Sequence, residues 1–361
     1  MRIAVDAREL APQPTGVGRY LLEILKVWTT DPGAADCELA ICTPTAIHLP
    51  LGEGGARSSY VVLPGSAGTS WEQLRLPFAV READVVFAPA YSAPLLALPP
   101  TVVTIHDVSF CAHPEWFTRR EGLRRRWTTQ LAAANAARVL TVSEFSKQEI
   151  VKWLGVQPAR VRVTPNGVSL GVRPPETPDR ADAAPLILFV GSQLNRRHVP
   201  DLVRAFAPIA RADARARLVL VGDNRSYPRE EPLRVARDLG IGGAVDQRAW
   251  IPDAELTSLY AMATACGWLS TYEGFGLPPL EAMAAGVPVV VYDTPVAREV
   301  YGDAAILVPA GSIEAVTAAL VALGDEETWQ ARRAAGLARA ARYTWTATAR
   351  LTLEALREAA A

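Results

Sequence analysis

The chain alternates short apolar runs with longer segments in which apolar and polar residues recur at helical spacing. This alternation predicts β-strands joined by helices, and therefore a parallel, doubly wound α/β sheet. In the first half the predicted strands are 3–5, 40–42, 60–63, 85–88, 102–105 and 139–142. The pattern then restarts, with apolar runs inside 185–192, 216–223, 244–251, 267–271, 287–293 and 304–309. The chain is thus expected to form two Rossmann-like domains.

The two patterns are separated by residues 171–185, GVRPPETPDRADAAP, which are rich in proline and charge and lack periodicity. Such a stretch is typical of an interdomain linker. We therefore expect one domain over residues 1–170 and another over residues 186–344. A chain of 361 residues that is 50% hydrophobic is long enough to give each domain its own core.

Charge and composition exclude several classes of protein. The formal net charge is −1, so the chain has no overall attraction for nucleic acid. The four cysteines form no CxxC pair, and no Cys/His cluster has metal spacing, so we expect no metal site and a reducing cytoplasm. No apolar run reaches the roughly 18 to 20 residues that cross a bilayer, and the amino terminus lacks the pattern of a signal peptide.

The most informative segment is 271–285, TYEGFGLPPLEAMAA. Gly274 and Gly276 allow backbone N–H groups to approach an anion, and the following residues begin a helix whose amino terminus favours phosphate. Glu273 on the loop and Glu281 in the helix can accept hydrogen bonds from hydroxyl groups at two ends of one ligand. The pattern predicts a nucleotide-sugar site; the alternative is a capping glutamate followed by a solvated one.

Two arginines follow the strand within 185–192. In the motif VGSQLNRRH, Gly191 and Ser192 begin a loop that carries Arg196 and Arg197. Each guanidinium can grip a phosphate with two parallel bonds, so the pair suits a diphosphate. The alternative is a solvated basic loop.

His106 and Asp107 stand at the carboxyl end of the predicted strand 102–105. Ligands of open α/β sheets bind at such ends, so His106 is a candidate catalytic residue. Asp107 is a candidate on the acceptor side, or a residue that only orients the loop. Asp6 and Arg8, just past the first strand, are either acceptor contacts or a structural salt bridge.

The motif PTGVGRY contains Gly16, Val17 and Gly18, the first two glycines of a dinucleotide-binding fingerprint with the residue between them. The third glycine is missing, and the distance from the first strand is too long for the tight turn. We therefore interpret these residues as an acceptor-side loop and disfavour an NAD-dependent oxidoreductase.

Together the motifs resemble those of the retaining glycosyltransferases of family 4, two-domain enzymes of the GT-B fold. The resemblance extends over almost the whole chain and includes PTGVGRY, TIHDVSF, VLTVSEFSKQEI, VTPNGV, LFVGSQLNRRH, LVLVGD, TYEGFGLPPLEAMAA and YTWTATAR. It implies that the last helical segment, within 345–361, packs back on the first domain. It also implies a nucleoside-diphosphate sugar as donor and no cofactor.

The resemblance assigns roles to the candidate residues. Arg196 and Arg197 match the positions that hold the donor diphosphate, although Arg197 replaces the usual lysine. His106 lies near the donor sugar, where Glu273 holds sugar hydroxyls and Glu281 the ribose. The remaining expected donor contacts are Gly191, Ser192, Gly222, Arg248, Gly274, Phe275, Gly276 and Leu277.

The family retains the anomeric configuration of the donor sugar. No DxD pair occurs in the sequence, so we expect metal-independent transfer by front-face attack. The sequence of residues 71–96 is similar to that of polysaccharide mannosyl- and rhamnosyltransferases. This similarity favours GDP-mannose as the donor and leaves UDP-sugars and dTDP-rhamnose open. The acceptor is a hydroxyl on a glycan, a lipid-linked molecule or a small molecule. The rival hypothesis is a catalytically silent nucleotide-sugar-binding subunit of the same fold.

A basic, aromatic stretch at residues 115–127 carries Trp116, Phe117 and Trp127 among five arginines. Such a stretch suits an anionic membrane that bears a lipid-linked acceptor, and predicts a cytoplasmic protein in peripheral contact with that membrane. The alternative is a solvated helix that covers the first domain.

Overall fold

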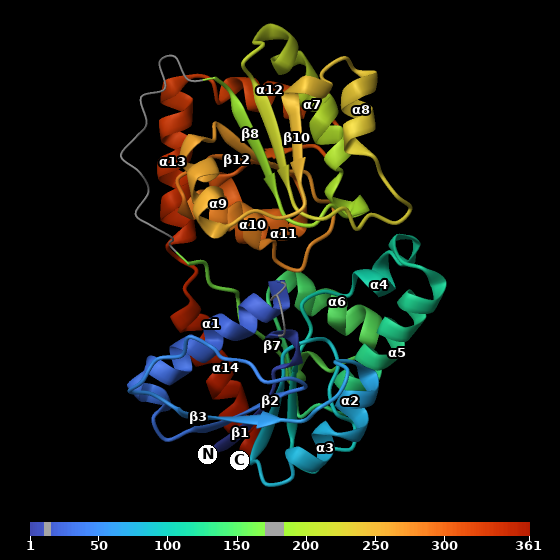
Figure 1. Cartoon of the computed structure of the whole chain (residues 1–361), viewed down its shortest axis with the longest axis vertical. Helices are drawn as coiled ribbons and strands as arrows, with labels where there is room; N and C mark the ends of the chain where they lie inside the picture. Colours follow the sequence, from blue (N-terminus) through green and yellow to red (C-terminus); the bar gives the residue numbers. More distant parts are fainter. Residues whose placement is uncertain (11–15, 170–183) are drawn as a thin grey trace. The chain divides into compact units, whose positions relative to one another are not determined.

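The computed structural model describes residues 1–10, 16–169 and 184–361 (Figure 1). The chain forms two compact units. The first unit contains Met1–Ala112, Arg119–Gly167 and Thr344–Ala361, and the second contains His113–Thr118 and Val168–Tyr343. Almost all of the predicted linker, 171–185, lies outside the described residues, as do Pro14 and Thr15 of the motif PTGVGRY.

The first unit is built on a parallel sheet of seven strands in the order β3-β2-β1-β4-β5-β6-β7. The strands are β1 (Arg2–Asp6), β2 (Glu38–Thr43), β3 (Arg57–Val62), β4 (Val85–Ala88), β5 (Thr101–Thr104), β6 (Arg138–Thr141) and β7 (Val161–Val163). Its helices are α1 (Gly16–Thr30), α2 (Thr69–Leu74), α3 (Leu76–Ala79), α4 (Ser109–Ala112), α5 (Arg119–Asn135), α6 (Glu144–Leu154) and α14 (Trp345–Ala360). The predicted fold class is confirmed here.

Alternation along β1 determines which helices cover each face of this sheet. Ile3 and Val5 pack in one core with α1 and α14. Ala4, which points to the opposite face, packs with Trp71 of α2 and Leu76 of α3. Figure 1 shows α1 and α14 on one side of the sheet and α2, α3, α5 and α6 on the other.

Helix α14 completes the core of the first unit. Trp28 of α1 donates its indole N–H to the carbonyl of Ala349 at 2.9 Å, and Leu353 and Leu356 are buried beside it. The helix begins after Thr344, whose hydroxyl accepts the N–H of Ala347. Burial of each leucine contributes about 1.5–3 kcal/mol, so the last helix is integral to the first unit.

The second unit has a parallel sheet of six strands in the order β10-β9-β8-β11-β12-β13. The strands are β8 (Leu186–Val190), β9 (Arg217–Val221), β10 (Val245–Arg248), β11 (Ala265–Trp268), β12 (Val289–Tyr292) and β13 (Ile306–Val308). Its helices are α7 (Val199–Ala212), α8 (Pro232–Asp238), α9 (Asp253–Met262), α10 (Leu277–Ala284), α11 (Pro295–Val300), α12 (Ile313–Ala322) and α13 (Glu326–Ala340). This unit repeats the predicted doubly wound pattern.

A short segment within the predicted first domain belongs to the second unit. Residues His113–Thr118 cluster with the second unit, where His113 stacks on Trp116 with ring centroids 4.0 Å apart. Both rings meet Tyr272 edge-on. The pattern of apolar runs does not predict that residues 113–118 belong to the second unit, because the contacts are made by aromatic side chains of a turn.

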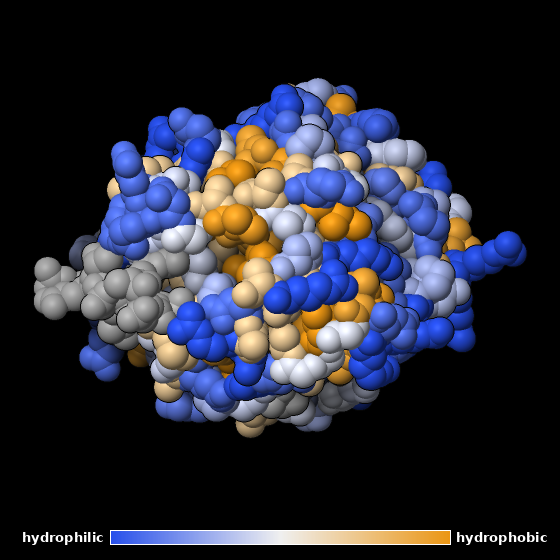
Figure 2. All heavy atoms as spheres, turned by 90° about the horizontal axis from the view of Figure 1, so that it is seen from above, coloured by the Kyte–Doolittle hydropathy of each residue, from blue (hydrophilic) through white to orange (hydrophobic). Residues whose placement is uncertain are grey.

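No helix in the described ranges is both long and apolar enough to cross a membrane. On the face seen in Figure 2, hydrophobic residues form separate patches between hydrophilic ones.

Each sheet has one place where the strand order reverses. In the first unit the chain proceeds from β1 to β2 and β3 on one side and then returns to β4 on the other side of β1. In the second unit the corresponding neighbours are β8 and β11. Loops that leave the carboxyl ends of such strands diverge and leave room for a ligand, so these two places are where sites are expected.

Candidate donor site at a strand-order reversal

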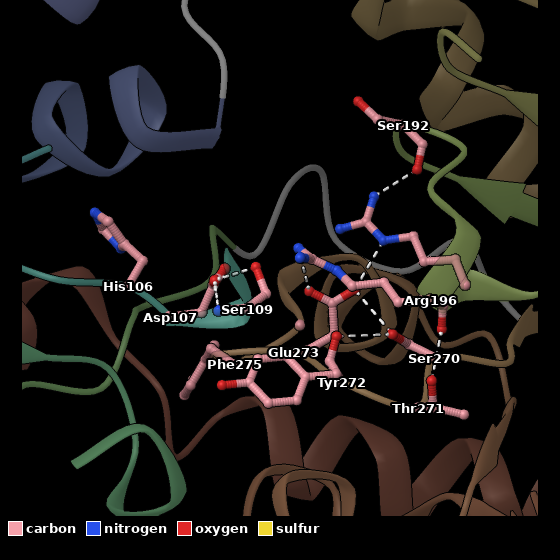
Figure 3. A network of polar contacts seen from close by, with 12 residues as sticks. His106, Asp107, Ser109, Ser192, Arg196, Ser270, Thr271, Tyr272, Glu273 and Phe275 are labelled. Atoms are coloured by element: carbon pink, nitrogen blue, oxygen red, sulfur yellow. Dashed lines mark hydrogen bonds and ion pairs between the residues drawn. The ribbon is translucent and has the colours of Figure 1, made fainter. Parts of the chain in front are cut away.

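Glu273 stands at the centre of a polar network beyond β8 and β11. Its carboxylate accepts from Arg197 Nε at 2.7 Å and from Ser270 Oγ at 3.1 Å, and Arg196 Nη2 lies 3.4 Å from the second oxygen. Figure 3 shows Glu273 and Ser270 facing each other within this network. The side chain of Glu273 is only 8% exposed, so the carboxylate is fixed in place.

The two arginines reach Glu273 from the loop after β8. They lie in the 3₁₀ turn Asn195–Arg197, and the carbonyl of Arg196 accepts the N–H of Thr271 at 2.8 Å. This bond joins the loop after β8 to the loop after β11. Two guanidinium groups against one carboxylate leave one positive charge in excess, which suits a phosphate group. The sequence predicted these three residues for the site, and the structure brings them together.

Helix α10 begins beside this network, as predicted. Gly276 precedes it with φ of 83°, and its carbonyl accepts the hydroxyl of Tyr301 at 2.8 Å. A Cβ at Gly276 would lie 2.0 Å from that hydroxyl, so glycine is required here. Burial raises the pKa of Tyr301 well above its usual value, so the phenol stays protonated and donates. Glu281 is half-buried about one turn into the helix.

The other predicted donor contacts occupy nearby positions. Gly274, Phe275 and Leu277 flank Gly276, and Phe275 is buried with its carbonyl 3.3 Å from the hydroxyl of Tyr301. Gly191 and Ser192 follow β8, where the N–H of Gly191 donates to the carbonyl of Val221 at 2.7 Å.

Gly222 and Arg248 lie on the other side of β8. Gly222 has φ of 134°, and a Cβ there would lie 2.2 Å from the carbonyl oxygen of Gly191. Arg248 forms ion pairs with Asp246 and Glu255. The structure does not bring the Arg248 side chain to Glu273.

His106 in the first unit has a defined orientation. Its Nε2 lies 2.9 Å from the carbonyl oxygen of Pro89, so this nitrogen carries a proton and donates. Tyr20 packs edge-on against the ring and Tyr91 packs beside it, and burial lowers the pKa of His106. The imidazole is therefore neutral near pH 7, with its proton on the nitrogen that faces Pro89.

Asp107 is engaged within its own loop. Its Oδ1 accepts the N–H of Ser109 at 2.9 Å and the hydroxyl of Ser109 at 2.7 Å, at the start of α4. Tyr91 donates its hydroxyl to Oδ2 at 3.3 Å. These contacts support the interpretation that Asp107 orients the loop.

A second charged network closes the first unit beyond β1 and β4, and sequence reasoning found only part of it. Arg8 Nη2 donates to Glu72 Oε1 at 2.6 Å and to Ser92 Oγ at 2.9 Å, and lies 3.4 Å from Asp6 Oδ2. The three charged side chains are nearly inaccessible to solvent. Of the two alternatives for Asp6 and Arg8, acceptor contacts or a structural salt bridge, the structure therefore supports the salt bridge. Glu72 was missed, because nothing in its local sequence marks a buried acid.

The prediction that Gly16, Val17 and Gly18 lie in a loop is wrong. The three residues form the first turn of α1, in which Gly18 is buried and Gly16 exposed. The helical spacing of the apolar residues that follow, such as Tyr20 and Ile24, extends back through these glycines.

In the described parts of the chain, no group of three or more His, Cys, Asp or Glu residues is arranged to hold a metal ion. The four cysteines, Cys37, Cys42, Cys111 and Cys266, are buried, and none forms a disulfide bond.

Sequence comparison connects both units to known families. Residues 14–172 match the profile of Glycosyltransferase Family 4, and residues 176–340 match that of Glycosyl transferases group 1. The chain is 27% identical over 256 residues to O-antigen chain mannosyltransferase B of Escherichia coli, which covers 68% of this chain and 66% of the relative. It is also 27% identical to the GDP-mannose:cellobiosyl-diphosphopolyprenol alpha-mannosyltransferase of Xanthomonas campestris, over 74% of this chain and 72% of the relative.

The fold has close counterparts among solved structures. Anabaena HepE in complex with UDP-glucose superposes with a TM-score of 0.75 over 99% of this chain and 100% of that one, at 18% identity. Among four curated relatives, the match spans 57% to 66% of the relative's length. The amino-terminal half of the chain therefore contains a Glycosyltransferase Family 4 domain, and the carboxyl-terminal half contains a Glycosyl transferases group 1 domain.

Proposed function

We propose that the protein transfers a hexose from a nucleoside-diphosphate sugar to a hydroxyl group of an acceptor, with retention of the anomeric configuration. The observation that carries this proposal is the buried Glu273 carboxylate held by Arg196 and Arg197 beside the start of α10. The arrangement offers an acceptor for sugar hydroxyls and donors for a diphosphate within one cluster. The family domains and the names of the relatives support the same reading.

The proposed reaction is a front-face substitution at the anomeric carbon. The bond from that carbon to the leaving phosphate oxygen breaks while the acceptor oxygen forms its new bond, and the acceptor proton passes to the leaving phosphate. The arginines stabilise the charge that develops on the diphosphate, and Glu273 orients the sugar. Glu281 holds the ribose hydroxyls, and His106 assists at the sugar by family resemblance.

We propose that the transfer needs no metal ion. The positive charge on Arg196 and Arg197 and the amino terminus of α10 support this proposal, since both can neutralise a diphosphate. Turnover should therefore persist in EDTA, and a requirement for Mg²⁺ or Mn²⁺ would contradict this part of the proposal.

GDP-mannose is the proposed donor. Relatives named as mannosyltransferases support it, one of them with GDP-mannose in its name. UDP-glucose, UDP-N-acetylglucosamine and dTDP-rhamnose are the alternatives to test.

The donor is tested first by thermal shift without added metal, since a ligand that binds only the native state raises the melting temperature. We expect GDP-mannose to raise it, and Glu281→Ala to abolish the shift. Glu314→Ala, on the exposed face of α12, is the matched control and should keep it. Stabilisation by NAD and by no sugar nucleotide would contradict the proposal. Binding of GDP-mannose without transfer to any acceptor would favour a silent binding subunit.

The proposed acceptor side includes a lipid surface, since the predicted basic, aromatic stretch continues into an exposed apolar stripe on α5. Leu123, Trp127 and Leu131 recur every four residues and are 59%, 59% and 42% exposed. The same helix carries five arginines, and its Arg125 pairs with Glu121. An apolar stripe flanked by arginines suits an anionic bilayer.

This contact is tested by sedimentation with vesicles that contain anionic lipid. The parent should sediment with the vesicles, and Arg124→Glu/Arg125→Glu should not. Arg229→Glu/Arg234→Glu makes the same charge change at exposed positions of the second unit and serves as the control. A parent that stays in the supernatant would show that α5 is a solvated helix.

A further inference from the structure

Trp268 is a buried aromatic residue at the carboxyl end of β11, in contact with Arg197 of the Glu273 network. It is 2% exposed, and its ring stacks on Phe189 of β8 with centroids 5.1 Å apart and planes inclined by 15°. The guanidinium carbon of Arg197 lies 4.3 Å from the centroid of the same ring. The arginine therefore rests on a rigid aromatic platform built by the two strands that flank the reversal of strand order.

Gly191 leaves space for this arrangement. A Cβ at Gly191 would lie 3.1 Å from the Trp268 ring and 3.4 Å from Arg197 Nη1. Its φ of 131° is also unfavourable for other residues. The backbone after β8 is thus shaped around the pair formed by Trp268 and Arg197.

The guanidinium of Arg197 is held on three sides. Nη1 donates to the carbonyl of Ser192 at 2.6 Å, Nε donates to Glu273 at 2.7 Å, and the guanidinium carbon lies over the ring of Trp268. Only a planar, forked cation can make these three contacts together, since an ammonium is a single point charge. The side chain is 12% exposed, so the contacts are largely shielded from water.

Arg196 meets Glu273 differently. Its Nη2 lies 3.4 Å from the carboxylate, a longer contact than that of Arg197. The two arginines therefore differ in how tightly Glu273 holds them, although their positions in the sequence are adjacent.

We propose that Arg197 and Trp268 are positioning residues for Glu273, and that Arg197 acts on the sugar end of the donor through Glu273, while Arg196 serves the diphosphate. This inference rests on the proposed function of the site. It departs from the diphosphate role that the resemblance and the mechanism proposed above give to Arg197, and it adds Trp268. It also explains why arginine occupies a position where lysine is usual: the aromatic platform and the Ser192 carbonyl select the planar group.

The test compares the affinity for GDP-mannose with that for GDP, measured by calorimetry on the parent and on Arg197→Lys. If Arg197 acts through Glu273, the substitution should weaken the binding of GDP-mannose by about tenfold and leave the affinity for GDP nearly unchanged. The value of kcat should fall as well, since a displaced Glu273 no longer orients the sugar. Arg196→Lys is the matched variant and should weaken both ligands alike.

The role of Trp268 is tested by comparing single and double variants of Trp268 and Arg197. Trp268→Leu should reproduce the effect of Arg197→Lys, and the double variant should be no worse than either alone, because both changes release the same guanidinium. Trp268→Phe keeps an aromatic surface and should retain most of the preference for the sugar nucleotide. Circular dichroism and the melting temperature of each variant verify folding, and the Arg197→Lys result stands even if Trp268→Leu fails to fold.

The outcomes of these binding measurements distinguish a failure of the inference about Arg197 from a failure of the proposed function. Equal weakening of GDP and GDP-mannose by Arg197→Lys would show that Arg197 grips the diphosphate and would overturn the inference alone. A parent that prefers UDP-glucose would be tested with UDP-glucose and UDP under the same expectations. A parent that binds no nucleotide at all would overturn the proposed function and the inference together.

Discussion

The two units share one topology and differ in the charge placed where the strand order reverses. The first unit has two acids and one arginine there, Asp6, Glu72 and Arg8, all nearly inaccessible to solvent. The second has two arginines and one acid, Arg196, Arg197 and Glu273. The first network is closed on itself, whereas the second carries an excess positive charge. The same fold therefore carries a buried network with a surplus acid in one unit and a buried network with a surplus cation in the other.

The surplus acid in the first unit has a measurable electrostatic cost. Burial raises the pKa of Asp6 from 3.8 to about 6, and Arg8 offsets only part of this effect. Asp6 Oδ2 makes no hydrogen bond, although it lies 3.4 Å from the Arg8 guanidinium. In the second unit a phosphate group of the proposed donor would cancel the surplus positive charge.

The largest effect is expected from removing the shared cation of the first unit. Arg8→Met leaves Asp6 and Glu72 buried without a counterion, and should lower the free energy of unfolding by about 3–5 kcal/mol. Equilibrium urea unfolding monitored by tryptophan fluorescence measures the loss. The triple variant Asp6→Asn/Arg8→Met/Glu72→Gln removes all three charges and should recover much of the stability. A stable Arg8→Met protein would mean that the network is not a closed structural cluster.

The next effect is a pH dependence caused by Asp6. An acid with a raised pKa holds its proton more tightly in the folded than in the unfolded protein, so stability falls as the pH rises from about 4 to about 6. Relative to Asp6→Asn, which does not titrate, the parent should lose about 3 kcal/mol across this window and then level off. Urea midpoints at several pH values check the difference. Glu82→Gln, at a side chain 84% exposed, is the control.

In the second unit the corresponding change should affect turnover more than folding. Glu273→Gln keeps the shape of the side chain and removes its charge, and should lower kcat on the order of 10²-fold because the sugar is no longer oriented. Its urea midpoint should move less than that of Arg8→Met. If Glu273→Gln kept normal turnover but lost much stability, the Glu273 network would be structural, like the Arg8 network, and the contrast between the two units would be wrong.

The smallest effect is expected at a charged contact away from both networks. Arg162 in β7 donates to Glu354 at 2.6 Å and to Glu358 at 2.8 Å, with all three side chains partly exposed. Solvent screens such pairs, so Glu354→Gln/Glu358→Gln should cost only about 0.2–1 kcal/mol per pair. A cost as large as that of Arg8→Met would show that charge surplus is not what distinguishes the buried networks.

The elements best predicted from the sequence are those that form a continuous apolar run. Strand β8 is such a run, and the start of α10 is marked by Gly276 and the prolines after it. Strand β7 was missed because it has three residues with Arg162 at its centre. Strand β3 begins at Arg57, three residues earlier than predicted, because its first residues are polar and lie at the sheet edge.

The candidate site follows the same rule. Motif spacing identified Glu273 and its two arginines, because each stands just beyond a readable strand. It did not identify Glu72 or Trp268, whose contacts join parts of the chain that are distant in sequence. Glu72 contacts Arg8 from 64 positions away, and Trp268 at the end of β11 contacts Arg197 in the loop after β8. Burial of this kind is a property of the packed unit and leaves no local trace in the sequence.

Helix α14 has a consequence for the order in which the protein is made. It supplies Ala349, Leu353 and Leu356 to the core of the first unit, yet the whole of the second unit precedes it in the chain. A ribosome therefore delivers every residue of the second unit before the first can close its apolar face. The half that is synthesised first is completed last, and until residues 345–360 emerge it presents α1 and its sheet to chaperones and proteases.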